Sequence, residues 1–161
     1  MTLDPFDVKL LNLIQRDNRL TAEALSAEVG LSPSACLRRL KRLRETKVIE
    51  SEIAVIAPAA VGRHLTMVVQ VCVERERPDI MDEFKRAMRA TPEVMQCFYV
   101  TGEIDFILVV TVKSMAHYED FTNRFFFTNS NIKRFNTLVV MDRVKVGLSV
   151  PIDAHEQTDF A

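Results

Sequence analysis

Six basic side chains are concentrated between residues 38 and 47, where Glu45 is the only acidic residue. Groups of this kind bind anions, and arginine in particular recognises phosphates and guanine edges through paired hydrogen bonds. The formal net charge of the 161-residue chain is only -1, so the positive charge is local. Because a local field decides which partners a surface attracts, this segment is the first candidate for a binding function. Its basic members are Arg38, Arg39, Lys41, Arg42, Arg44 and Lys47.

The other reactive side chains have no spacing suited to catalysis or metal binding. None of the three cysteines or three histidines stands near a second ligand or a nucleophile–base partner at the required distance in sequence. We therefore predict that the chain is not an enzyme, that it needs no metal or cofactor, and that its cysteines are small buried side chains. These residues are Cys36, Cys72, Cys97, His64, His117 and His155.

The composition indicates a soluble globular chain with one or two small domains. Hydrophobic residues make up 48% of the chain and charged residues 27%. No apolar run approaches the ~20 residues that cross a bilayer. The start "MTLDPFDVKLL" lacks the basic and apolar parts of a signal peptide. We expect a cytoplasmic protein with no membrane partner.

Three capping signals predict three short helices in the first 46 residues. Asp4 and Ser32 each precede a proline, and Thr21 precedes "AEALSAEV". Gly30 can adopt the left-handed conformation that ends the second helix, which makes a helix–turn–helix connection. One small core is predicted from the apolar residues at helical spacing, which are Phe6, Leu10, Leu13, Ile14, Ala24, Leu25, Val29, Cys36, Leu40 and Leu43.

The third helix is predicted to bind double-stranded DNA. When Cys36, Leu40 and Leu43 face the core, the basic residues point outward on a face that suits the major groove. Residues near the helix start usually meet base edges, so Arg38 and Arg39 are expected to carry sequence-specific binding, and the later Lys41 and Arg42 are expected to hold phosphates. The alternative is a merely solvated basic helix, but capping, turn and charge agree on DNA binding. The predicted contacts are Ser32, Ser34, Ala35, Arg38, Arg39, Lys41 and Arg42.

The segment "VIESEIAVIAP" alternates apolar and polar residues from Ile49 to Ile53 and predicts a strand, with Pro58 marking its exit. An isolated strand needs a partner. We expect it to be a wing and linker that pairs with its copy in a second subunit and so brings two recognition helices onto one DNA.

Residues 64–146 predict strand, helix, strand, strand, helix and strand, which is the ferredoxin-like order. The segments are 64–74, 78–90, 94–100, 105–112, 114–127 and 137–146. The predicted fold class is therefore α+β. A winged helix-turn-helix domain over 1–63 is followed by a ferredoxin-like βαββαβ effector and oligomerisation domain over 64–150 and a tail over 151–161.

The segment "DFILVVTV" is apolar on both alternating faces. Helices can cover only one face of such a sheet, so we expect the other face to be buried against another subunit. Residues 64–146 alone should then form dimers or larger species.

The order of these pieces resembles the Lrp/AsnC (feast/famine) family of prokaryotic transcription regulators. The resemblance runs from residue 3 to about 150 and rests on "LDPFDVKLLNLIQRD", "GLSPSACLRRLKRL" and the Gly-x-x-Asp loop in "VTGEID". It implies a DNA-binding domain, an effector and assembly domain, and homodimers that build tetramers or octamers.

The resemblance also implies an effector, typically an amino acid, bound between dimers near "YVTGEID". Asp105 could bind its ammonium group, although the residue type alone also suits a turn that caps backbone N–H groups. The chain departs from the family at "FFFTNSNIKRF", so the effector's side chain is not implied, and residues 147–161 receive no role. The matching positions are Tyr99, Thr101, Gly102, Glu103, Asp105, Thr137, Leu138 and Val139.

Two other functions are alternatives to an effector-responsive regulator. An architectural protein that compacts DNA without an effector would also oligomerise, but it does not need the Gly-x-x-Asp loop. A tetrapyrrole decarboxylase of related fold would place histidine and arginine around a haem precursor. The scattered histidines and the intact basic helix disfavour this enzyme. The operator, the effector's identity and the sign of regulation are open.

Overall fold

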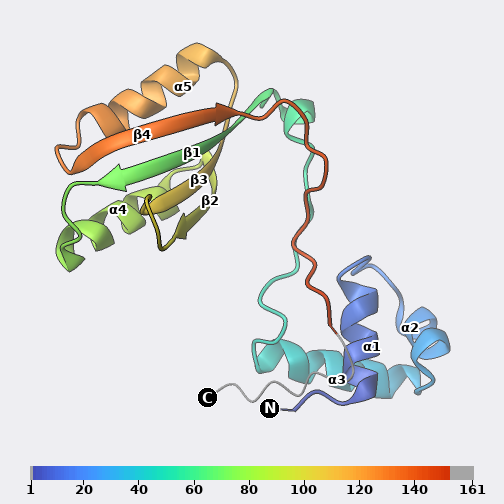
Figure 1. Cartoon of the computed structure of the whole chain (residues 1–161). Coiled ribbons are helices and arrows are strands. Elements are labelled where there is room, and N and C mark those ends of the chain that lie inside the picture. Colours follow the sequence, from blue (N-terminus) through green and yellow to red (C-terminus); the bar gives the residue numbers. More distant parts are fainter. Residues whose placement is uncertain (1, 153–161) are drawn as a thin grey trace. The chain divides into compact units, whose positions relative to one another are not determined.

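A computed structural model describes residues 2–152 of the chain. They form two compact units (Figure 1). The described residues of Met1–Ala54 and Lys145–Ala161 make unit one, and Val55–Val144 make unit two. The sequence suggested a boundary at residue 63 and a tail after residue 150, whereas compactness groups residues 145–152 with unit one.

Unit one contains α1 (Pro5–Ile14), α2 (Ala22–Val29) and α3 (Pro33–Glu45), and each begins at its predicted cap. The side chains of Asp4, Thr21 and Ser32 accept hydrogen bonds from backbone N–H groups of the first turn. Gly30 ends α2 with φ 81°, in the left-handed region that favours glycine. The predicted helix–turn–helix connection is confirmed.

The core of unit one matches the apolar pattern on α2 and α3 but differs on α1. Phe6 was expected inside, yet it is 37% exposed and its ring lies 5.5 Å from the Arg39 guanidinium carbon. The buried positions of α1 include Asp7, a charged residue that no hydrophobic pattern predicts. The core cluster consists of Leu10, Leu11, Leu25, Val29, Cys36, Leu40 and Leu43.

The segment after residue 144 packs on α1. The Gln15 amide donates to the Val150 carbonyl (2.9 Å) and accepts from the Val150 N–H (3.0 Å). Asn12 donates to the Ile152 carbonyl (3.1 Å), and the Ile152 side chain packs against the core of unit one. The sequence predicts no role for these residues. In the structure they pack against α1 and the core of unit one.

The strand expected over Ile49–Ile53 is not formed. Residues 50–57 have no regular secondary structure, and the exposed side chains there include Ile53 and Val55. A β-strand requires a hydrogen-bonded neighbour, and no strand of the described residues pairs with this segment. The pairing with a second subunit stays a prediction.

Unit two begins with a 3₁₀ helix (Pro58–Val61) and then has the predicted strand–helix order. The strands form one antiparallel sheet in the order β2-β3-β1-β4. A π-helical turn (Asn123–Phe127) follows α5. The elements are β1 (Leu65–Val73), α4 (Pro78–Ala90), β2 (Val94–Tyr99), β3 (Phe106–Val112), α5 (Met115–Thr122) and β4 (Ile132–Val139).

The last strand lies earlier in the chain than the predicted 137–146. β4 pairs with β1 from Ile132 beside Val73 to Val139 beside Met67. The Val140 N–H still donates to the Thr66 carbonyl, but β1 begins at Leu65. Beyond this point β1 has no further backbone groups to pair with, so β4 cannot continue to residue 146.

Both long helices of unit two cover the same face of the sheet (Figure 1). Alternate residues of β1 and β3, such as Val69 and Leu108, are fully buried beneath Phe84 of α4 and Phe121 of α5. Neither α4 nor α5 covers the opposite face.

Candidate nucleic-acid interface and effector site

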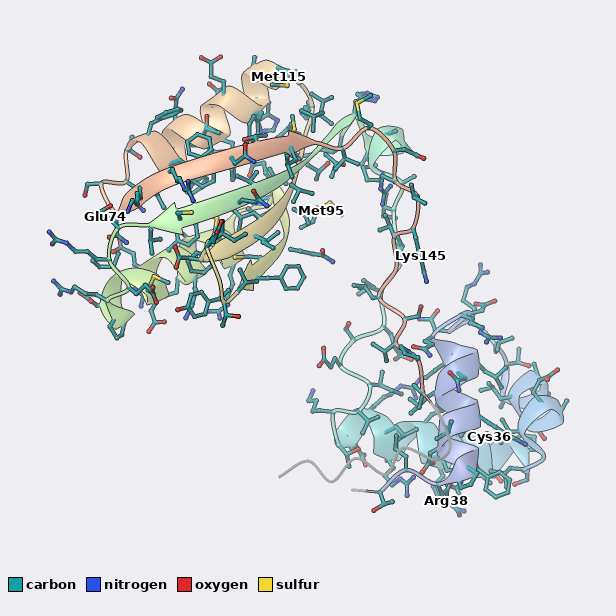
Figure 2. All side chains as sticks on the ribbon, viewed as in Figure 1. Cys36, Arg38, Glu74, Met95, Met115 and Lys145 are labelled. Carbon is teal, nitrogen blue, oxygen red and sulfur yellow. The ribbon has the colours of Figure 1, made fainter. Side chains whose placement is uncertain are left out.

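The exposed side of α3 carries the predicted contacts. Ser34 and Arg38 are exposed, Ala35 is half-buried, and Cys36 is buried. Figure 2 labels Arg38 and Cys36 on this helix. The Ser32 hydroxyl accepts from the Ala35 N–H (3.2 Å) and lies 3.2 Å from the Ser34 hydroxyl. The start of α3 therefore presents small polar groups, with Arg38 one turn further along.

Two of the predicted cations are already bound by carboxylates. Arg39 Nη1 donates to Asp4 Oδ2 (2.6 Å) and Asp7 Oδ1 (2.9 Å), and Arg42 Nη2 donates to Asp7 Oδ2 (2.5 Å). The hydrogen bonds that Arg39 donates to Asp4 and Asp7 raise the pKa of Arg39, and burial opposes this rise only in part. Burial also acts against the charged form of Asp4, yet the Asp7 N–H and Arg39 lower its pKa.

The other two predicted cations, Arg38 and Lys41, have weaker partners or none among the described residues. Arg38 forms no ion pair within residues 2–152. Lys41 lies 3.8 Å from Glu45, and both side chains are largely exposed. Arg38, Arg39 and Arg42 line an open hollow of about 230 Å³. Its lining of guanidinium groups suits an anion such as a phosphate.

Asp7 is the functional candidate that sequence reasoning missed. Its signal is a capping box, in which Asp4 caps α1 and Asp7, three residues later, accepts from the Asp4 N–H. The pattern predicts a helix start, but it does not show that the second carboxylate also reaches α3.

The loop that joins β2 to β3 is closed by Asp105. Its Oδ2 accepts from the Val73 N–H (2.7 Å), its N–H donates to the Val71 carbonyl (2.9 Å), and its carbonyl accepts from the Val100 N–H (2.9 Å). Asp105 therefore has the backbone-capping role that its residue type allowed. Oδ1 has no hydrogen-bond partner among the described residues. Gly102 has φ 123°, and Thr101 and Glu103 beside it are exposed.

Tyr99 lies on the rim of this loop, half exposed. Its ring packs on Phe106 at 5.2 Å, and Lys85 Nζ lies 4.9 Å from the ring centre. Its hydroxyl is 3.3 Å from Glu76 Oε2, and the charge of Glu76 raises the pKa of Tyr99. Lys85 and Glu76 were not predicted, because they come from α4 and from the turn before it.

A single chain does not bring the two predicted effector segments together. The loop meets β1 at Val71, whereas Val139 pairs with Met67, four residues or roughly 13 Å away along β1. The segments also belong to strands on opposite sides of β1. Thr137 points toward α5, where its hydroxyl lies 2.5 Å from that of Tyr118.

Cys72 connects this loop to β4. Its thiol donates to the Glu103 carbonyl (3.3 Å), and Arg134 Nε donates to its sulfur (3.3 Å). Within residues 2–152, no three His, Cys, Asp or Glu side chains gather as metal ligands. The same residues contain no helix with the length and apolarity to span a membrane.

Two family models match the chain. An AsnC-type helix-turn-helix domain matches residues 3–44, and an Lrp/AsnC ligand binding domain matches residues 66–150. The uncharacterized HTH-type transcriptional regulator y4tD of Sinorhizobium fredii is 58% identical over 153 residues, which cover 95% of this chain and 90% of that protein. The leucine-responsive regulatory protein of Haemophilus influenzae is 35% identical over 143 residues, covering 89% and 86%.

Solved structures agree with these matches. A transcriptional regulator of Neisseria meningitidis in complex with L-methionine superimposes with a TM-score of 0.87 at 33% identity, covering 93% of this chain and 97% of that one. An AsnC family regulator of Agrobacterium tumefaciens has a TM-score of 0.86 at 27% identity, covering 92% and 97%.

Proposed function

The chain belongs to the Lrp/AsnC family of transcription regulators, and we propose that it binds operator DNA as a homo-oligomer whose affinity responds to an amino acid. The observation that carries the proposal is the exposed basic face of α3 in a helix-turn-helix, on the same chain as a ligand-binding domain. Because the relatives are named as regulators, we infer regulation in the cytoplasm and not catalysis.

The DNA contacts of α3 divide by position. Ser34, Ala35 and Arg38 lie in the first half of the helix, which usually meets base edges in the major groove. Ser32 and Lys41 flank this group and are placed to contact phosphates. Arg38 is the proposed reader of a guanine edge, since its guanidinium is exposed and free of carboxylates within the described residues.

A second copy covers the open face of the sheet. Phe98 and Leu138 are 50% and 48% exposed on this face. Leu138, Val68 and Val109 form one row across β4, β1 and β3, and Phe98 pairs with Ile107 on β2 and β3. Apolar side chains that continue across a sheet in this way indicate a protein interface. We infer a homodimer through this face, with further contacts that build a tetramer or an octamer.

The proposed effector site uses the loop of one subunit and β4 of another. Asp105 Oδ1 faces the ligand's ammonium group, and Gly102 lets the ligand's carboxylate approach the backbone N–H groups. Tyr99, Thr101 and Glu103 form the rim. Thr137, Leu138 and Val139 come from a second copy, because within one chain they lie on the other side of β1 and are displaced along it by two to four residues, roughly 7 to 13 Å, from the point where the loop meets Val71. The Neisseria neighbour, whose complex holds L-methionine, supports an amino acid as the class of effector.

A thermal-shift screen of the twenty amino acids, with L-methionine first, tests the effector class. A hit raises the melting temperature by mass action, and DNA footprinting with that amino acid then shows whether operator binding responds. If no amino acid shifts melting while DNA is still bound, the protein is architectural. If the protein does not bind DNA, the proposed regulatory function is wrong.

Two variants separate the proposed effector-binding role of Asp105 from its role in closing the loop. Asp105→Asn keeps an oxygen that accepts from the Val73 N–H but removes the charge, whereas Asp105→Ala removes both. Calorimetry should show loss of effector binding in both variants, with the folded oligomer retained in Asp105→Asn. Wild-type effector affinity in Asp105→Asn would show that the carboxylate only closes the loop.

A further inference from the structure

We propose that Asp7 is a positioning residue for DNA binding, which holds Arg39 and Arg42 as a preset phosphate clamp on α3. The inference rests on the DNA-binding function proposed above. It assigns these two arginines to the sugar–phosphate backbone through a residue of α1 that itself does not touch DNA.

The geometry places one guanidinium on each oxygen of a buried carboxylate. The Asp7 side chain is 1% exposed. Its Oδ1 accepts from Arg39 and its Oδ2 from Arg42, at 2.9 and 2.5 Å. Asp4 takes a second hydrogen bond from Arg39, and the Phe6 ring packs beside that guanidinium. Both arginines are therefore fixed in the free protein.

The buried carboxylate keeps these partners when DNA arrives. If both arginines left Asp7 for phosphates, its charge would be stranded in the interior, which is strongly unfavourable. They do not need to leave, because a guanidinium has five N–H donors. Within residues 2–152, Arg39 gives only Nη1, and Arg42 only Nη2, to carboxylates.

Arg39 and Arg42, whose other donors make no hydrogen bond among the described residues, line the hollow together with Arg38. The Arg42 side chain is 45% exposed and that of Arg39 is 23% exposed, so solvent and a phosphate can reach them. A phosphate that enters does not have to order two long side chains, since Asp7 has already restricted them. Arg38 has no such carboxylate partner among the described residues.

Asp7→Asn distinguishes positioning from simple charge neutralisation, because the two roles predict opposite changes in DNA affinity. The variant makes the protein more positive, so neutralisation alone predicts tighter binding and a steeper salt dependence. Positioning predicts binding that is weaker by about tenfold, the size of one charged hydrogen bond lost per subunit. The probe is a labelled DNA duplex of random sequence, because phosphate contacts carry no sequence preference.

Arg42→Lys provides a second variant if Asp7→Asn fails to fold, since it preserves charge but removes the planar fork. Arg44→Lys is the matched control, because Arg44 lies on the same helix but pairs with Glu52 and does not line the hollow. We expect weaker binding for Arg42→Lys and unchanged binding for Arg44→Lys.

Fluorescence anisotropy over a salt series measures each affinity, and thermal melting confirms the fold. Equal or tighter binding by folded Asp7→Asn, or unchanged binding by Arg42→Lys, would overturn the clamp while leaving DNA binding by the wild type intact. A wild-type protein that does not bind the duplex would overturn the proposed function instead.

Discussion

Glu93 is a buried carboxylate whose charge should stabilise unit two. It lies just before β2, and its side chain is 10% exposed. Arg124 Nη2 lies 2.6 Å and His117 Nε2 lies 3.1 Å from its Oε1. His117 belongs to α5 and Arg124 to the π-helical turn that follows, so Glu93 anchors the helix that places Tyr118 against Thr137.

The magnitude follows from the pKa of this group. Burial opposes the charged form, but Arg124, backbone hydrogen bonding and His117 outweigh it and lower the pKa of Glu93 from 4.5 to about 2. At about 1.4 kcal/mol for each pKa unit, the charge contributes about 3 kcal/mol to the free energy of unfolding. A depressed folded-state pKa means that this contribution is complete above pH 4.5 and is lost as the pH falls toward 2.

The perturbation is Glu93→Gln, which keeps an acceptor for Arg124 but removes the charge. Urea unfolding can be followed in unit two alone, because the chain has no tryptophan and both of its tyrosines, Tyr99 and Tyr118, lie there. We expect the free energy of unfolding of the variant to be about 3 kcal/mol lower than that of the wild type at pH 7. This difference should narrow steadily below pH 4.5.

Glu119→Gln, an exposed change on α5, is the matched control and should follow the wild type at every pH. If the free energies of unfolding of Glu93→Gln and wild type differ by the same amount from pH 7 to pH 3, the charge of Glu93 does not stabilise unit two. The pairing with Arg124 and His117 then contributes less than expected.

Three further outcomes are expected. Arg38→Ala should weaken footprinted operators by ~1–3 kcal/mol if it pairs with guanine, while binding to random duplex changes little; an unchanged footprint refutes this role. Val109→Asp, on the open sheet face, should shift light scattering from oligomer toward monomer, and an intact oligomer would place the interface elsewhere. A chain that ends at Val144 should melt earlier in unit one than a chain that ends at Ile152, because only the longer chain keeps the hydrogen bonds to α1. Identical melting would show that the C-terminal segment adds nothing to unit one.

Much of the proposed DNA-binding surface could be predicted from local sequence. The caps at Asp4, Thr21 and Ser32 act over three residues, and the apolar spacing of α3 decides which side of one helix is exposed. Such signals do not show which distant residue the end of a side chain contacts. The sequence therefore predicts the same role for Arg39 and Arg38. Only the packing of α1 on α3 separates them, because it brings Asp7 to Arg39 from 32 residues away.

In unit two the sequence by itself determined the order of strands and helices and the two apolar faces of β3, because alternation and helical period are properties of short segments. Tertiary structure decided the extent of β4, which ends where β1 no longer offers backbone partners. It also decided that Asp105 closes a loop and that Thr137 lies away from it, since strand register depends on hydrogen bonds between segments distant in the chain. The packing of residues 150–152 on α1 arises in the same way: a few hydrogen bonds across more than a hundred residues leave no periodic trace in the sequence.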